Sequence, residues 1–324
     1  MPDEHGHLTR EEVILAYRLM LSRDPENEQV IEAHRRHWRD PVAFGRAIAE
    51  SEEFRRRLAP APAATLPLDA AANSVESTAD EAALARLFAP VARYWEAIGQ
   101  VSPHWSVLPD ARFLPENIAG NAEDFFASGE AEARLLEAAL ARLGRAPDGF
   151  AHAVEQGCGL GRVTRHLAAR FPALTAVDVS LPHLRLAAQA LAEAGVEGVT
   201  FAQAVPGKLV PVSGFDLWFS QRTLQHNPPP LTRAVLRAAF AALAPRGVAV
   251  FQTATWMESF HFDTPSYLAG RNGAEMELHA LPQAEIFALA GEAGMRVVEV
   301  REDQTLAAWP RPILSNRFVM VKAG

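Results

Sequence analysis

The chain has 324 residues, enough for one large domain with an appendage or for two domains. Hydrophobic residues make up 49% of it, and the net charge of −8 argues against nucleic acid as a partner. The single cysteine, Cys158, excludes an intrachain disulfide. It favours a cytoplasmic protein, as does the lack of a signal peptide or of an apolar run of about 20 residues.

Residues 8–58 predict a small all-α domain. Thr9 and Glu12 have the spacing of a capping box at the start of the first helix. Asp40 and Pro41 look like an N-cap followed by proline at the first position of a third helix. The apolar residues recur at helical spacing, so we expect them to form a core: Val13, Ala16, Tyr17, Met20 and Leu21 in the first helix, and Phe44, Ile48 and Leu58 in the third.

Residues 59–80 are rich in Ala, Pro, Ser and Asp and read as a linker. A helical pattern resumes at Glu81, and a stretch rich in proline and aromatic residues leads to a helix over 129–143. We therefore expect residues 81–145 to form a helical lid or cap, next to a core domain over 146–324.

Strand and helix patterns alternate from residue 146 to the end of the chain. Regular alternation implies a doubly wound, mostly parallel sheet, in which ligands lie beyond the carboxyl ends of the strands. The expected helices span 162–170, 181–195, 231–243 and 282–294. The expected strands span 152–156, 174–180, 199–203, 215–220, 248–254, 296–303 and 316–323.

The loop after the first of these strands contains three glycines in five residues. Its sequence, GCGLG, has neither the lysine nor the spacing of a phosphate-binding P-loop. A dinucleotide fingerprint would require a third glycine where this chain has Arg162.

With the acidic residue before it, the segment Glu155–Gly161 resembles the E/D-x-G-x-G-x-G motif of class I S-adenosylmethionine-dependent methyltransferases. The segments FDLWFSQRTLQH and LAPRGVAVF are similar to the fourth strand and the entry to the fifth strand of that family. The resemblance covers roughly residues 120–324. It implies a Rossmann-like, seven-stranded fold and S-adenosylmethionine as cofactor.

In that family the glycine loop wraps the amino acid part of the cofactor. The helix N-terminus after the loop would favour its carboxylate, and Glu155 would favour its ammonium. Asp178 would accept hydrogen bonds from the ribose hydroxyls, as an acid does in nicotinamide dinucleotide sites too. Members of that family often have Asp or Glu just after the third strand, where it bonds the adenine amino group, whereas this chain has Gln203 or Ala204 at that position. The implied cofactor-binding residues are Glu155, Gly157, Cys158, Gly159, Gly161, Arg162, Asp178, Val179, Gln203, Ser220 and Gln221.

Two histidines are candidates for a general base toward a hydroxyl acceptor. His226 follows the fourth strand, where it is either a base or a packed loop residue, and His279 precedes the last helix. Cys158 needs only to be small and is not expected to be a nucleophile. No metal site is expected, since no further ligands surround His34 and His37. The candidate substrate-binding residues are Arg222, His104, Trp105 and Glu277.

The segment AYRLMLSRDPEN and the residues after it resemble a short helical domain of bacterial surface and polysaccharide-related proteins. This resemblance implies that residues 8–58 bind a protein partner, and it favours a saccharide acceptor. The first hypothesis is O-methylation of a hydroxyl on a small molecule or saccharide. The alternative is a catalytically idle binding module of the same fold. A dinucleotide-dependent oxidoreductase comes third, because the glycine spacing disfavours it.

Overall fold

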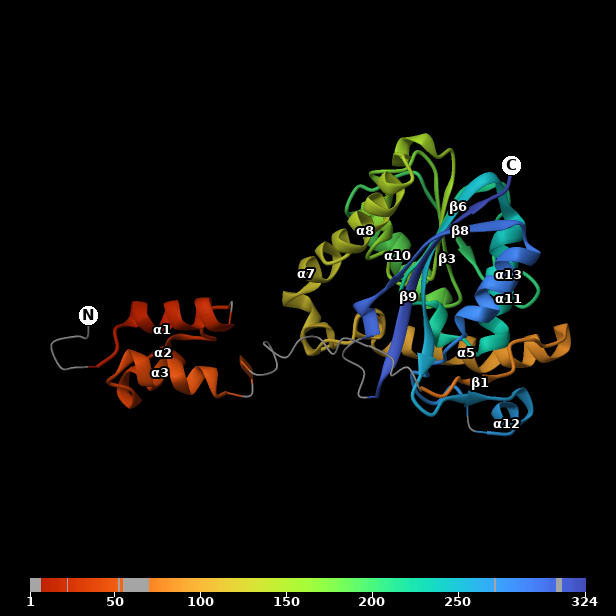
Figure 1. Ribbon diagram of the computed structural model, residues 1–324. Coiled ribbons are helices and arrows are strands. Elements are labelled where there is room, and N and C mark those ends of the chain that lie inside the picture. Colours follow the sequence, from red (N-terminus) through yellow and green to blue (C-terminus); the bar gives the residue numbers. More distant parts are fainter. Residues whose placement is uncertain (1–6, 22, 52, 55–69, 271, 307–310) are drawn as a thin grey trace. The chain divides into compact units, whose positions relative to one another are not determined.

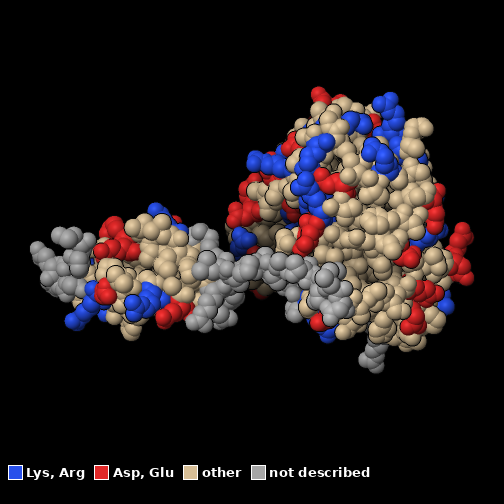
Figure 2. Space-filling model, viewed as in Figure 1, with Lys and Arg blue, Asp and Glu red and all other residues tan. Residues whose placement is uncertain are grey.

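A computed structural model describes residues 7–21, 23–51, 53–54, 70–270, 272–306 and 311–324 (Figure 1). The chain divides into two compact units, Met1–Thr65 and Leu66–Gly324. Acidic and basic side chains are interspersed on each unit on the face shown in Figure 2. Within the described residues, no helix has both the length and the apolar character needed to cross a membrane.

The first unit contains the predicted helices α1 (Arg10–Ala16), α2 (Glu28–His37) and α3 (Pro41–Ala49), with a π-helical turn after α1. The capping box at the start of α1 and the Asp40 cap of α3 are both confirmed. The predicted Leu58 lies outside the described residues. The core of the unit is apolar and joins all three helices: Leu8, Val13, Tyr17, Leu21, Ile31, Phe44 and Ile48.

The second unit is built on a seven-stranded sheet, which confirms the predicted doubly wound, mostly parallel fold. The strand order is β4-β3-β2-β5-β6-β9-β8, and β9 runs antiparallel to both of its neighbours. The strands are β2 (Ala153–Gln156), β3 (Leu174–Asp178), β4 (Val199–Gln203), β5 (Phe215–Ser220), β6 (Leu243–Met257), β8 (Met295–Glu302) and β9 (Ile313–Lys322).

Helices cover both faces of this sheet, with α8 on one side and α11 and α13 on the other (Figure 1). Side chains alternate between the faces: Leu217 packs in one buried cluster and its neighbour Trp218 in the other. The helices of this unit are α5 (Glu81–Val101), α6 (Pro103–Val107), α7 (Ala122–Ala127), α8 (Glu130–Arg142), α9 (Thr164–Ala168), α10 (Leu181–Glu193), α11 (Pro229–Ala242), α12 (Thr264–Ala269) and α13 (Gln283–Glu292).

Two elements differ from the predicted ones. The helix expected over 162–170 is only the five-residue α9, because the chain first makes a turn in which the Gly161 N–H donates to Cys158 O. β6 begins directly after α11 and runs to Met257, well beyond the predicted 248–254, because β9 pairs with it as far as its last residue.

The described part of the predicted linker 59–80 belongs to the second unit. β1 (Ser74–Val75) pairs with β7 (His261–Phe262) in a small parallel sheet. The Asn73 side chain accepts from the N–H and donates to the C=O of Met257, at 2.9 and 2.7 Å. Backbone pairing thus makes this segment part of the second unit, which composition alone does not reveal.

Candidate active site

A cavity of about 430 Å³ lies at the carboxyl ends of the parallel strands, where the sequence predicts a ligand. Its walls come from the loops after β2, β3, β4 and β5, from α5, α6, α10 and α11, and from the segments before α13 and after β8. Of the residues predicted from the sequence, ten line it: Glu155, Gly157, Cys158, Gly159, Arg162, Asp178, Val179, Gln221, Arg222 and His226.

The glycine loop is held close to its neighbours. Gly157 has a φ of +81°, and a Cβ there would lie 2.1 Å from Thr223 Oγ1 in the loop after β5. A Cβ on Gly159 would lie 2.7 Å from Val107 Cγ2. Gly161 does not line the cavity; a Cβ there would meet Leu191 of α10 at 2.7 Å. Two of the three glycines thus let the loop form the cavity wall, and the third lets α10 pack.

Asp178 ends β3 with its carboxylate at the cavity. Oδ2 accepts from the Gly159 N–H at 2.8 Å and Oδ1 from the Ser180 N–H at 2.9 Å. A carboxylate has about four acceptor positions, so two remain for ligand hydroxyls. Gln203 does not line the cavity, because its side-chain amide donates to Val179 O at 3.1 Å; Ala204 lines the wall instead.

Burial raises the pKa values of two groups in the segment Glu155–Gly161. Burial raises the pKa of Glu155 to about 7, although the Thr164 hydroxyl donates to its carboxylate at 2.6 Å. Burial also raises the pKa of the Cys158 thiol well above its ordinary value. A thiol that stays protonated is a poor nucleophile, so the small size of Cys158 explains its place in the loop.

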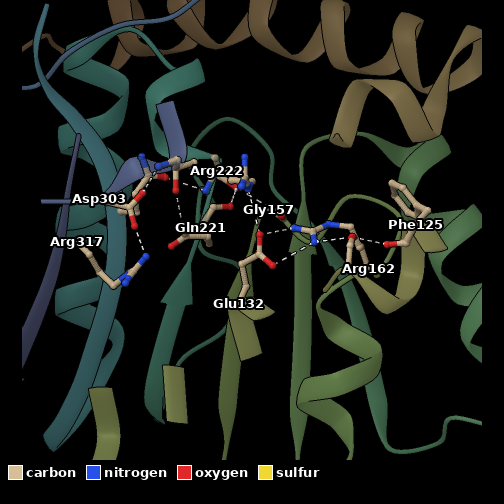
Figure 3. A network of polar contacts seen from close by, with 12 residues as sticks. Phe125, Glu132, Gly157, Arg162, Gln221, Arg222, Asp303 and Arg317 are labelled. Carbon is tan, nitrogen blue, oxygen red and sulfur yellow. Dashed lines mark hydrogen bonds and ion pairs between the residues drawn. The ribbon is translucent and has the colours of Figure 1, made fainter. Parts of the chain in front are cut away.

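A buried carboxylate joins two arginines beside the glycine loop (Figure 3). Arg162 contacts both oxygens of Glu132, at 2.9 and 3.2 Å, and Arg222 Nε donates to one of them at 3.1 Å. Burial raises the pKa of Glu132, but the hydrogen bonds and charges of the two arginines outweigh burial and lower it. Glu132 is therefore ionised and orients both guanidinium groups.

Arg222 has an unusual backbone for a residue with a long side chain. Its φ is +58°, a left-handed conformation that costs about 1 to 3 kcal/mol outside glycine. Its N–H donates to Gln252 Oε1 at 3.0 Å, and the amide of Gln252 donates to Ser315 Oγ at 2.7 Å. The buried Gln252 therefore holds Arg222 in this conformation.

His226 lies at the cavity wall with one ring nitrogen already bonded. Its Nδ1 is 3.0 Å from Glu277 O, and its ring meets Trp95 edge-on at 5.2 Å. Burial lowers the pKa of His226 to about 4, so the ring is neutral at pH 7. Since a carbonyl can only accept, Nδ1 carries the proton and Nε2 has the lone pair. The side-chain amide nitrogen of Gln225 lies 3.4 Å from Nε2.

Glu277 and His279 do not line this cavity but lie behind His226. The Glu277 carboxylate accepts from the Tyr267 hydroxyl at 2.7 Å and the Gly273 N–H at 3.1 Å, and His279 Nε2 is 3.2 Å away. The backbone N–H of His279 donates to the backbone carbonyl oxygen of Gln225 at 2.8 Å. This Glu277 clamp, consisting of Glu277, Tyr267, Gly273 and His279, fixes the carbonyl that His226 contacts.

Three other predicted residues lie outside the cavity lining. The ring of His104 packs edge-on against Phe125 at 4.9 Å, and its neighbour Trp105 is also absent from the wall. Ser220 is fully buried and donates to Gln156 O at 3.0 Å. Each lies one or two residues from a lining residue, Ser106 or Gln221, so the segment was predicted correctly and the side chain was not.

Several lining residues were missed from the sequence. His183 lies in the first turn of α10 and has its Nε2 2.9 Å from Ser106 Oγ. Its place in the first turn after β3 was the signal that could have found it. Gln221 donates to Thr305 Oγ1 at 3.0 Å, bringing a C-terminal segment to the site without any motif. The other missed residues include Trp95, Ser106, Met276, Leu278 and Leu306.

The polar groups at the cavity fit S-adenosylmethionine. Gln156 Oε1 has no hydrogen-bond partner among the described residues and can accept from an ammonium. Asp178 can accept from hydroxyls, and Arg222 can donate to a carboxylate. The described residues contain no cluster of three or more His, Cys, Asp or Glu arranged for a metal ion.

Comparisons with known proteins agree with this geometry. Residues 153–247 match a family described as a methyltransferase domain. Trans-aconitate 2-methyltransferase of Streptomyces avermitilis is 36% identical over 138 residues, which are 42% of this chain and 49% of that protein. The chain thus matches about half the length of this relative.

Two solved structures are similar in fold. Magnesium protoporphyrin IX methyltransferase from Synechocystis PCC 6803, with bound SAM, has 15% identity and a TM-score of 0.49, over 76% of this chain and 100% of that one. The N-methyltransferase NodS from Bradyrhizobium japonicum WM9 has 19% identity and a TM-score of 0.43, over 60% and 88%. Residues 153–247 of the second unit thus match a methyltransferase domain, and the strand order and the glycine loop are those expected from the resemblance to the class I S-adenosylmethionine-dependent fold.

Proposed function

We propose that this protein transfers a methyl group from S-adenosylmethionine to an oxygen atom of a small molecule, with His226 as the base. The observation that supports this proposal is that the glycine loop, Asp178 and His226 line the same cavity. The ring of His226 is neutral and partly accessible there. A binding module would have no use for an oriented base beside the cofactor loop.

When bound, S-adenosylmethionine supplies a methyl group on a sulfonium, which is already activated for in-line displacement. The chain then has to orient the acceptor and exclude water. Nε2 of His226 accepts the hydroxyl proton as the oxygen attacks, because Nδ1–H is held by Glu277 O. Asp178 and the glycine loop hold the cofactor, and the apolar lining, which includes Trp95 and Leu278, excludes water.

The acceptor is a hydroxyl in this proposal, and a saccharide hydroxyl is the first to test. The reason is the resemblance of residues 8–58 to helical domains of polysaccharide-related proteins. Those residues are proposed to be an accessory domain that binds a partner. The exposed Leu15 and Leu19 on the described part of that unit support this role.

A second candidate acceptor is a carboxylate, which needs no base. The name of the relative, trans-aconitate 2-methyltransferase, supports it, and so does a cationic side chain, Arg222, at the cavity wall. Loss of the His226 imidazole separates the two acceptors, since it slows transfer to a hydroxyl much more than transfer to a carboxylate.

Calorimetric titration with S-adenosylmethionine tests the cofactor assignment, with NAD as the control ligand. We expect S-adenosylmethionine to bind and NAD not to bind. The affinity for S-adenosylmethionine should fall at least about tenfold in Asp178→Ala, because this substitution removes two acceptor positions. Transfer of labelled methyl to sugars and to trans-aconitate then tests the acceptor. A folded protein that binds no S-adenosylmethionine would refute the enzyme and favour the idle binding module.

A further inference from the structure

Arg222 has donors that the described residues leave unused. Arg162 already contacts both oxygens of Glu132, so Arg222 reaches that carboxylate only through Nε. Neither terminal nitrogen of Arg222 has a hydrogen-bond or ion-pair partner in the described part of the chain. Two guanidinium groups thus share one carboxylate, and one positive charge is left at the cavity wall.

The Arg222 guanidinium is also oriented. Glu132 is buried and fixes Nε, while Gln252 fixes the left-handed backbone from the other side. About a third of the side chain, 36%, remains exposed, and Arg222 lines the cavity. A fork held at Nε with two free terminal nitrogens matches the two oxygens of a carboxylate.

The helix after the glycine loop does not supply an alternative anion site. The α9 helix has only five residues, so the dipole at its N-terminus is small.

We propose that Arg222 is the carboxylate-binding residue of the cavity and that its terminal nitrogens bind one carboxylate in a bidentate manner. This inference rests on the proposed function only for the source of that carboxylate, which is either the methionine end of the cofactor or the acceptor. Glu132 acts as the positioning residue that presents the fork.

The cofactor source is tested by comparing S-adenosylmethionine with decarboxylated S-adenosylmethionine, using calorimetry on the full chain. If the cofactor carboxylate binds Arg222, Arg222→Gln weakens S-adenosylmethionine about 10- to 100-fold and leaves the decarboxylated compound unchanged. Arg134→Gln is the matched control, since Arg134 is exposed on α8 and, within the described part of the chain, pairs only with Glu130.

The acceptor source is tested by titrating citrate, with triethyl citrate as the uncharged probe. If the acceptor carboxylate binds Arg222, Arg222→Gln abolishes citrate binding and leaves S-adenosylmethionine binding unchanged. This arm needs no turnover, so a failure of the proposed methyl transfer does not affect it.

The proposal is overturned if Arg222→Gln changes neither affinity, or if it weakens S-adenosylmethionine and its decarboxylated analogue equally. Arg222→Lys covers the case in which Arg222→Gln does not fold. It keeps the charge but loses the fork, so we expect an intermediate loss confined to the same carboxylate ligand.

Discussion

Nδ1 of His226 lies 3.0 Å from the backbone carbonyl oxygen of Glu277, 51 residues further along the chain. This contact fixes the tautomer of His226 and leaves Nε2 unprotonated. Its neutral state and its position at the cavity wall are the basis for the predictions on catalysis.

Replacement of His226 by Asn should lower kcat for a hydroxyl acceptor by about 10²- to 10⁴-fold, the usual contribution of a general base. The affinity for S-adenosylmethionine should stay within about twofold, because the Asp178 and glycine-loop contacts are unchanged. Steady-state kinetics and calorimetry on the same protein measure both. An unchanged kcat would remove His226 from the mechanism.

The pH dependence of kcat should reflect the lowered pKa of His226. With a pKa of about 4, the ring stays neutral and able to accept a proton as the pH falls from 8 to 6. An exposed histidine would lose half of its neutral form near pH 6.5. We expect this group to cause a fall in rate only near pH 4 to 5. A fall centred near pH 6.5 that disappears in His226→Asn would contradict the burial argument.

The Glu277 clamp should affect catalysis without contacting the substrate. Tyr267→Phe removes the hydroxyl that donates to the Glu277 carboxylate, so the carbonyl that orients His226 is held less firmly. We expect kcat to fall up to about 100-fold with little change in cofactor affinity, since small misplacements of a reacting group cost this much. The nitrogen shifts of His226 in NMR report the tautomer directly, and an unchanged tautomer together with an unchanged kcat would refute the positioning role.

Gly157→Ala should destabilise the fold more than Gly144→Ala. Both glycines have positive φ, so both substitutions pay the left-handed penalty of about 1–2 kcal/mol. At Gly144 a Cβ meets nothing within 4 Å, whereas at Gly157 it would lie 2.1 Å from Thr223 Oγ1. Overpacking adds at least about 1 kcal/mol to the loss in unfolding free energy.

Urea denaturation of the two variants measures this difference. Adding Thr223→Gly to Gly157→Ala removes the clashing side chain and should restore part of the loss. If Gly144→Ala and Gly157→Ala were equally stable, close packing of the loop on Thr223 would not be the reason for glycine.

The stability of the protein without ligand should depend on Glu155. Its pKa is raised from the model-peptide range to about 7, so the folded state holds a proton that the unfolded state releases. The contribution of this proton to the free energy of unfolding is fully present below about pH 4.5 and is lost as the pH rises through 7. It amounts to about 3 kcal/mol between these limits.

Glu155→Gln removes this titration. From pH 5 to pH 8, the unfolding free energy of Glu155→Gln relative to that of the unmodified protein should therefore rise by about 2.5 kcal/mol. Denaturation at several pH values measures it, and other titrating groups such as His226 cancel in the difference. A difference independent of pH would mean that Glu155 is ionised in the folded protein.

The sequence predicted the elements whose side chains repeat with a clear period. The strands β2 to β5 and the helices α8, α10 and α11 were placed within a few residues, because each buries one or both faces over its whole length. The caps Thr9 and Asp40 were correct for a similar reason, since capping depends on residues two or three positions away. The boundaries of β6 and α9 were missed, because strand pairing with β9 and a loop turn set them.

For the site, the sequence by itself determined the glycine loop and the strand ends, since Glu155, Gly157 and Asp178 occupy positions that the strand and turn pattern fixes locally. Only the tertiary structure decided which neighbouring side chain faces the cavity: Ala204 instead of Gln203, and Ser106 instead of His104. It also decided that Glu132 orients Arg222 and that Glu277 orients His226. These pairs are 90 and 51 residues apart, and no local spacing specifies contacts that packing of distant elements creates.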